Sequence, residues 1–519
     1  MKRDDAGTLE TSAFRLGYDE RNGRSRVGAS LLAAVAVCAL STGCKNEAGS
    51  AKADPKAKAD PKAMADPKAT PDPKTKPDQK PTPNVAGAEP VTCAFDPTWI
   101  TSSSLPTEVP GTADCDFHKF AWQSFAYLIQ TTEANGPTRF ETWMPGYGIF
   151  VAGPTETPTP WGTIPPTGCS GSAADALVYS SITKQAGAEQ PLLDQQGEKV
   201  YYGISVNQTA YEFLTGCDLY RHGCSAQLAD KSGGIDLMAE YPDLAFPDQS
   251  IELKMAWKVL TAEEASSGSF YQTTGYVQPD DANPGTCRQE TLGLVGLHIV
   301  SKTPNHPEFI WATFEHRNNA PDCTDLEAKP AKGDWTFFDL DTYKACTAPR
   351  CTNVYEPGKP GQVCREHPYG DASQGRFPTG HSCKDDPNQA ICQPAALAAA
   401  AQNTANMQSI NSGAQTAYGS AVWANYFLTG NVYTNGGVIP PAVQAWQGSL
   451  SAANTVMETY VQNGASGAQN PASCFSCHDM VSSDGAPDLP PVGLSHIFAS
   501  VQDGSGGCTD GKLPDTCTM

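Results

Sequence analysis

The stretch SIELKMAWKVL, residues 250–260, decides the fold prediction. Its apolar and polar side chains alternate strictly, so that every second residue is apolar. A period of two residues places one set of side chains against a core and the other set toward solvent. The stretch therefore predicts a half-buried β-strand, whose apolar side consists of Ile251, Leu253, Met255, Trp257 and Val259.

Other elements are predicted on both sides of this strand. LGLVGLHIVSK at 292–302 and EFIWATFEH at 308–316 are typical of strands, and Pro304 and Pro307 between them are consistent with a hairpin or a short loop. A helix is predicted over 115–132, where apolar residues recur at helical spacing. Its expected buried face is Phe117, Phe120, Ala121, Phe125 and Leu128, and the remaining predictions are a helix at 394–410, a strand and turn at 422–434 and a helix at 449–462.

These patterns predict an α+β fold. We expect a β-rich, disulfide-containing body over residues 91–393. We expect residues 394–519 to form a short, mainly helical C-terminal segment that carries the chemical motif of the chain.

The N-terminal region has the pattern of an export signal. Basic residues within the first 26 positions precede an uncharged apolar run, Val27 to Leu40, which is too short for an ordinary membrane span. The following LSTGC resembles the bacterial lipoprotein box, although Ser41 stands where a large apolar residue is usual. We therefore predict a signal peptide of lipoprotein type at 1–43 with lipid attachment at Cys44, and ordinary cleavage after Gly43 is the alternative.

Residues 44–90 are predicted to be a disordered tether. The motif ADPKA occurs at 53–57, 59–63 and 65–69, and the region lacks the large apolar residues that a core needs. Such a tether would hold the body at a distance from the membrane to which Cys44 is anchored.

The charge of the chain is concentrated in the body. The whole chain has 35 Lys and Arg against 56 Asp and Glu, and residues 1–90 contain 15 and 12 of these, so residues 91–519 contain 20 and 44. A net charge of −24 over residues 91–519 disfavours binding to nucleic acid and favours a basic partner protein.

The chain contains 18 cysteines. Cys38 lies in the predicted signal, and Cys44 is the predicted lipid site. Apart from Cys474 and Cys477, 14 cysteines remain, an even number that suggests disulfides in an exported protein. The sequence leaves the connectivity open, and short loops make three pairs plausible: Cys217–Cys224, Cys383–Cys392 and Cys508–Cys517.

The stretch SCFSCHDM, residues 473–480, matches the attachment motif of c-type haem. Cys474 and Cys477 lie three residues apart, so one helical turn directs both thiols toward the two vinyl groups of one haem. His478 then supplies an imidazole nitrogen to the iron, and Ser473 is suited to cap the start of the turn. The sequence therefore predicts one covalent haem c.

Three other interpretations of the motif compete with haem. Cys474 and Cys477 could form a structural disulfide, act as a thiol-exchange pair, or provide half of a zinc site. No second CxxC is present, and no thioredoxin-like strand–helix unit surrounds the motif. The export signal, the adjacent His478 and the even number of remaining cysteines favour haem.

The second axial ligand stays open in the sequence. Only 41 residues follow His478, so the haem must be covered by the preceding body. Met457 and His496 are near enough in sequence to be distal candidates. His298 and His316, on the two strongest strands after 260, could also reach the haem from the body.

Six stretches within residues 115–500 are distinctive: FAWQSFAYLI, RFETWMPG, ELKMAWKVL, GLVGLHIVSKTP, EFIWATFEHRNNAPDC and SCFSCHDM. Together they resemble a family of exported bacterial proteins known only as cytochrome c family. The resemblance runs over much of residues 115–500 and implies haem binding and a redox role, without a substrate or a catalytic residue.

Polar residues inside the predicted strands form a further candidate group. His298, Glu315 and His316 could bind a metal, line a haem edge or serve in acid–base chemistry, or the histidines could be buried and satisfied by hydrogen bonds. Alternation places Glu315 and His316 on opposite faces of one strand. His118, on the first helix, is expected at the surface or at a cap.

Three functions follow from these observations. The first is an extracytoplasmic electron-transfer protein with one covalent haem, held at the membrane by its lipid anchor and exchanging electrons with redox partner proteins. The second is a haem-dependent oxidoreductase or peroxidase with a pocket in the β-rich body. The third is a non-redox binding module in which the motif forms a disulfide.

Overall fold

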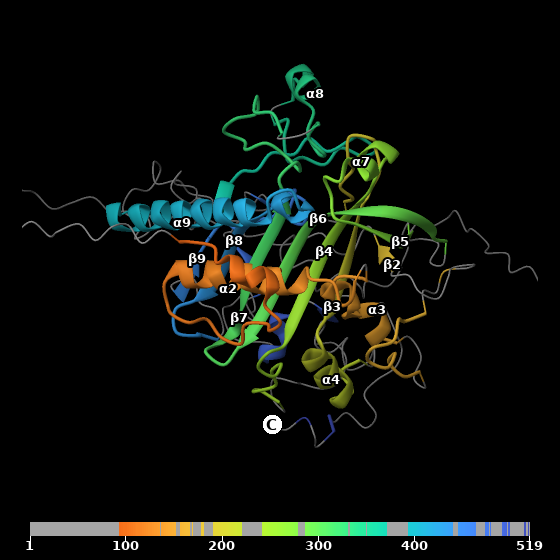
Figure 1. Cartoon of the computed structure of the whole chain (residues 1–519), viewed down its shortest axis with the longest axis vertical. Coiled ribbons are helices and arrows are strands. Elements are labelled where there is room, and N and C mark those ends of the chain that lie inside the picture. Colours follow the sequence, from red (N-terminus) through yellow and green to blue (C-terminus); the bar gives the residue numbers. More distant parts are fainter. Residues whose placement is uncertain are drawn as a thin grey trace, which may run out of the picture.

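A single large β-sheet organises the protein (Figure 1). The computed structural model describes residues 93–134, 136–151, 156–166, 169, 178–180, 190–220, 241–278, 286–330, 333–348, 350–370, 393–439, 445–462, 473–476, 478, 490–495, 497–498, 513–514 and 517. The predicted signal peptide at 1–43, the predicted tether at 44–90, and Cys44, Cys477 and His496 lie outside these residues.

The described residues form a nine-stranded sheet in the order β1-β3-β2-β5-β6-β7-β8-β9, with β4 inserted between β3 and β6. All pairings are antiparallel except that of β2 with β5. The predicted α+β class with a β-rich body is confirmed. The strands are β1 (Met144–Pro145), β2 (Val178–Ser180), β3 (Val200–Val206), β4 (Ile251–Val259), β5 (Gln272–Gln278), β6 (Arg288–Thr303), β7 (His306–His316), β8 (Tyr426–Thr434) and β9 (Trp446–Gly448).

The three strands that the sequence predicts most clearly form the centre of the sheet. Strand β4 pairs with β6 over its whole length, and β6 turns directly into β7, with Thr303 opposite His306. The predicted strands and their hairpin connection are therefore confirmed. The alternation that predicts a half-buried strand holds over residues 251–255, where Glu252 and Lys254 stay partly exposed. It fails toward the end of β4, because Lys258 is fully buried between the carboxylates of Asp194 (3.3 Å) and Glu264 (2.5 Å).

Two long helices cover one face of the sheet. In Figure 1, α2 (Asp114–Leu128) and α9 (Pro394–Tyr418) lie side by side across the strands. The predicted apolar face of α2 is buried throughout, and its Trp122 and Phe125 pack against Phe314 of β7. Both predicted helices are confirmed, and α9 continues eight residues beyond 410.

His118 of α2 does not lie at the surface, and the sequence-based expectation is wrong. Its ring is fully buried and hydrogen-bonded to Asn403 of α9 (2.6 Å) and Asn431 of β8 (3.1 Å). The reason is that α9 covers the side of α2 that the helical pattern assigns to solvent.

Irregular segments from the C-terminal part of the chain cover the other face of the sheet. Residues 451–462 lie there in turns, so the predicted helix at 449–462 is wrong. The Asn454 side chain instead binds the backbone of Val456 (3.0 Å) and the side chain of Thr313 (2.9 Å), and the backbone N–H of Thr455 donates to Glu315 (2.8 Å). Local polar bonds of this kind compete with helix formation.

Residues 394–519 contribute to the same sheet as the body. Strand β8 pairs with β7, and β9 pairs with β8. Residues of the C-terminal segment also fill one of the cores, where Phe475, Val492, Leu494 and Ile497 are fully buried.

Five disulfides link the described residues, and they fit an extracytoplasmic protein. The short-loop pairs Cys217–Cys224 and Cys508–Cys517 are wrong, because Cys217 bonds to Cys517 across 300 residues of sequence. The pair Cys383–Cys392 lies outside the described residues. The observed bonds are Cys93–Cys115, Cys169–Cys287, Cys217–Cys517, Cys323–Cys364 and Cys346–Cys351.

Short helices complete the described structure. None of the helices within it reaches the length and hydrophobicity that crossing a membrane requires. They are α3 (Gly146–Ile149), α4 (Gln208–Gly216), α7 (Ala262–Ser267) and α8 (Leu340–Ala345), with 3-10 turns η1 (Pro97–Thr101), η2 (Arg139–Thr142), η4 (Pro368–Gly370), η6 (Val422–Asn425), η8 (Cys474–Ser476) and η9 (Pro491–Leu494).

Candidate functional site

The predicted haem motif forms a single helical turn on the sheet face opposite α2 and α9. The backbone N–H of Ser476 donates to the carbonyl of Ser473 (3.0 Å), and that of His478 donates to the carbonyl of Cys474 (3.0 Å). Cys474 and His478 are therefore neighbours one turn apart. The Ser473 hydroxyl is buried and hydrogen-bonds to none of the described residues, so its carbonyl, and not its side chain, starts the turn.

Phe475 anchors this turn in the core. It is fully buried between Trp311 of β7 (ring centroids 6.3 Å apart) and Trp446 of β9 (5.9 Å). The surrounding core is apolar and includes Val300 and Val432 from the strands on either side of Trp311. The motif therefore lies against an aromatic wall that the sheet provides.

Contacts with Leu494 and Trp311 orient the ring of His478. Its Nδ1 lies 2.7 Å from the carbonyl oxygen of Leu494 in η9, and its ring centroid lies 4.1 Å from that of Trp311. A carbonyl oxygen can only accept, so Nδ1 carries the proton, and Nε2 carries the lone pair of the neutral ring. Metal-ligating histidines are commonly fixed in this way, with one nitrogen donating to a backbone carbonyl.

Cys474 is partly buried and takes part in no disulfide. Burial raises the pKa of its thiol to about 12, and the nearby carboxylate of Glu458 adds to the effect, while Lys254 opposes it. The thiol is therefore protonated at neutral pH. Thiol exchange depends on a thiolate, so this environment does not favour an exchange cysteine.

These features fit a covalently attached haem. An apolar aromatic wall, a histidine whose Nε2 carries the lone pair and an unbonded thiol one turn away are the donors and surroundings that haem c needs. The second thiol, Cys477, lies outside the described residues.

The two distal candidates lie in different places. Met457 is fully buried at Gly296, where its methyl carbon would lie 3.0 Å from an added Cβ. Gly296 is four residues from Val300, roughly 13 Å along the strand, so Met457 packs against a different part of β6 from the aromatic wall around Phe475. His496 lies outside the described residues. Its neighbour Ser495 is described, and the Ser495 hydroxyl donates to Glu252 of β4. The distal ligand stays a prediction.

His298 belongs to a charged group on the same sheet face as the motif. Its Nε2 lies 3.2 Å from a carboxylate oxygen of Glu458, and Lys254 Nζ lies 3.9 Å from the same oxygen. Burial would raise the pKa of Glu458, but the charge and hydrogen bond of His298, together with Lys254 and a backbone N–H, outweigh burial and lower it. Glu458 is therefore an anion, and its negative charge contributes to the raised pKa of the Cys474 thiol.

Glu315 and His316 lie on opposite faces of β7, as the alternation predicts, and neither joins the motif. Glu315 is fully buried and pairs with Arg365 (2.8 Å). His316 donates to the carbonyl of Ser269 (3.0 Å), accepts from the backbone of Asn318 (3.2 Å), and has its pKa lowered to about 3 by burial. His316 is therefore a buried neutral histidine whose hydrogen bonds are satisfied.

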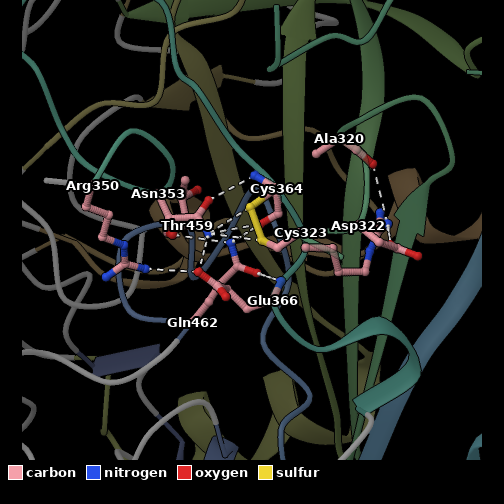
Figure 2. Close-up of a disulfide and its surroundings, with 10 residues drawn as sticks. Ala320, Asp322, Cys323, Arg350, Asn353, Cys364, Glu366, Thr459 and Gln462 are labelled. Atoms are coloured by element: carbon pink, nitrogen blue, oxygen red, sulfur yellow. Dashed lines mark hydrogen bonds and ion pairs between the residues drawn. A yellow bond between two sulfur atoms is a disulfide. The ribbon is translucent and has the colours of Figure 1, made fainter. Parts of the chain in front are cut away.

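The Cys323–Cys364 disulfide has a carboxylate beside it, Glu366, in a group with metal-ligand spacing (Figure 2). Glu366 accepts from Arg350 (3.0 Å) and Asn353 (3.1 Å). Because the two sulfur atoms are bonded to each other, they offer no thiolate to a cation. This group is therefore a structural crosslink.

Sequence reasoning missed the residues that surround the motif. Trp311 and Trp446 stand beside it only because β7, β8 and β9 are neighbours, and Leu494 contributes a backbone carbonyl, which no side-chain pattern marks. No protein-family model, curated protein or solved structure matches this chain.

Proposed function

We propose that the chain is an extracytoplasmic c-type cytochrome that carries one covalent haem and transfers electrons. The S–H groups of Cys474 and Cys477 would add across the two vinyl groups, forming two thioethers without a leaving group. His478 would bind the iron through Nε2. The observation that carries this proposal is the hydrogen bond from His478 Nδ1 to the Leu494 carbonyl, in the same turn as an unbonded Cys474.

The proposed location and partners follow from the sequence. The signal at 1–43, lipid attachment at Cys44 and the tether at 44–90 would hold the body outside the cytoplasm at a membrane. The net charge of −24 over residues 91–519 favours a basic redox partner protein and disfavours nucleic acid.

Absorbance of the denatured protein tests haem attachment. The chain is produced in a host that attaches haem to exported cytochromes, and we expect haem absorbance to persist in detergent and the mass to increase by one porphyrin. Cys474→Ala with Cys477→Ala should lose both signals. Cys346→Ala with Cys351→Ala, which removes a disulfide outside the motif, should keep them. A wild-type mass without porphyrin would contradict the proposal.

A haem-dependent oxidoreductase or peroxidase is a second candidate. The favouring observation is the Lys254–His298–Glu458 group, which lies near Cys474 and supplies residue types that acid–base catalysis uses. Low-spin iron that does not react with cyanide supports electron transfer, whereas high-spin iron that binds cyanide supports the enzyme. The third candidate, a non-redox module, requires a disulfide at the motif. Cys474 takes part in no disulfide, so this candidate is not supported.

A further inference from the structure

A cavity of about 290 Å³ lies at the far end of β7 from the haem motif. Arg317, which directly follows β7, and Phe427, near the start of β8, lie on its walls. Arg317 is six residues from Trp311, roughly 20 Å along the strand. The cavity is therefore separate from the site that contains Cys474 and His478, and binding in it requires no haem.

One part of the cavity lining is an arginine, Arg365, whose positive charge is balanced by two carboxylates. Arg365 is buried, and its guanidinium donates to Glu315 (2.8 Å) and Asp322 (2.7 Å) above the ring of Phe427. Burial alone would lower the pKa of Arg365, but the two carboxylates outweigh burial and raise it. The charge of Arg365 is thus balanced within the protein.

Arg317 differs from Arg365 because its charge is not balanced. Within the part of the chain that the structure describes, none of the ion pairs includes Arg317. Its Nε is buried without a hydrogen-bond partner, and burial lowers its pKa, an effect that Tyr369 partly offsets. A partly buried guanidinium remains charged and is stabilised by an oxyanion that its planar donors can bind.

Helix α9 contributes neutral hydrogen-bonding groups to the lining. Gln408, Ser412 and Gln415 of α9 are exposed, follow one another at helical spacing and line the cavity. Tyr369 of η4 completes the cavity with a left-handed backbone (φ 57°, ψ 32°), which is strained for a residue other than glycine and is common at binding sites.

We propose that this cavity binds a small hydroxylated monocarboxylate, such as a sugar acid. Arg317 supplies the single unbalanced positive charge, which matches one carboxylate. A phosphate dianion would lack a second unbalanced cation, because Arg365 is already paired with Glu315 and Asp322. The amide and hydroxyl groups of Gln408, Ser412 and Gln415 match the hydroxyl groups of such a ligand.

Calorimetry on the mature full chain tests the proposal with four probes: gluconate, inorganic phosphate, citrate and glucose. We expect gluconate to bind more tightly than the other three. Arg317→Gln should weaken gluconate binding about tenfold or more, since a charged hydrogen-bonding partner is lost. Arg350→Gln is the matched control, because Arg350 pairs with Glu366 outside the cavity and should leave binding unchanged.

A second variant keeps the test decisive if Arg317→Gln does not fold. Gln408→Ala with Gln415→Ala changes only exposed side chains of α9 and should weaken gluconate binding about tenfold, because two neutral hydrogen-bonding groups are lost. Gluconate that does not bind at millimolar concentration, equal binding of glucose, tighter binding of phosphate or citrate, or full binding by a folded Arg317 variant would each overturn the proposal.

Discussion

His118 shows how a buried residue contributes to the response to acid. Its Nε2 donates to Asn403, and its Nδ1 accepts from the Asn431 amide, so the ring is neutral with both nitrogens occupied. Burial lowers its pKa to about 4, while the hydrogen bonds to Asn403 and Asn431 and the charge of Asp114 partly oppose the shift. A proton added to Nδ1 would face the N–H group of the Asn431 amide, so two donors would meet and this hydrogen bond would be lost.

We therefore expect acid to destabilise the protein through His118. In the unfolded chain this histidine takes up a proton near pH 6.5, whereas in the folded protein it does so near pH 4. The unfolded state binds more protons between these values, so stability is lost as the pH falls from about 6.5 to 4, by on the order of 3 kcal/mol. Urea unfolding at several pH values measures this loss. His118→Gln, which retains an amide for hydrogen bonding, should lose less stability over that interval, and parallel pH curves would contradict the assignment.

The local chemistry of the motif could be predicted from the sequence more readily than its surroundings. The spacing of Cys474, Cys477 and His478 points to haem because each residue type has one chemical role at a fixed distance along the chain. The environment of His118 is different. It depends on Asn403, 285 residues away, and no local pattern reports such a partner.

At the level of elements, α9 covers the edge of β8 at Leu428, where β9 does not pair with that strand. The Asn411 side chain accepts from the backbone N–H of Leu428 (3.0 Å) and donates to the carbonyl of the same residue (2.9 Å), as a neighbouring strand would. It also accepts from the indole of Trp122 (3.0 Å), which joins α2 to the same point. One amide therefore connects both covering helices to β8.

Replacing this amide should destabilise the whole protein. Asn411→Ala leaves a buried backbone N–H, a carbonyl and an indole N–H without partners, at a cost of about 3 kcal/mol or more in the free energy of unfolding. Asn406→Ala is the control on the same helix, because Asn406 bonds only to the exposed Gln402 among the described residues. Denaturant unfolding of both variants measures the difference, and a loss no larger for Asn411→Ala than for Asn406→Ala would show that the edge does not depend on this residue.

Element prediction succeeded where burial is periodic and failed where polar bonds determine the backbone. Strands β4, β6 and β7 have one apolar face against α2 and α9, so alternation reports them directly. Residues 449–462 contain a helix-like spacing of apolar residues, yet Asn454 and Thr455 bond to β7 in preference to a helix. The sequence alone does not show that Asn454 and Thr455 lie next to Thr313 and Glu315 in the folded protein.

At the scale of the whole molecule, disulfides connect segments that are remote in sequence. Cys217, at the end of α4, bonds to Cys517, and the haem motif lies within the segment between β9 and that bond. The core that contains Phe475 also contains Cys217 and Cys517. The covalent bond therefore holds the segment that carries the motif at its far end, while β9 holds it at the other.

Removing this bond should cost more than removing a local one, since a disulfide stabilises mainly by restricting the unfolded chain. For a separation of 300 residues chain entropy gives about 5 to 6 kcal/mol, against about 2 kcal/mol for the separation of 5 residues between Cys346 and Cys351. Cys217→Ser with Cys517→Ser should therefore unfold at a clearly lower denaturant concentration than Cys346→Ser with Cys351→Ser. Of the disulfides between described residues, the first pair is the one that ties down the segment after β9. Brief proteolysis should therefore cleave after β9 in that variant and spare the control. Equal midpoints with equal cleavage would mean that the contacts of Phe475 and Leu494 hold the segment without the covalent bond.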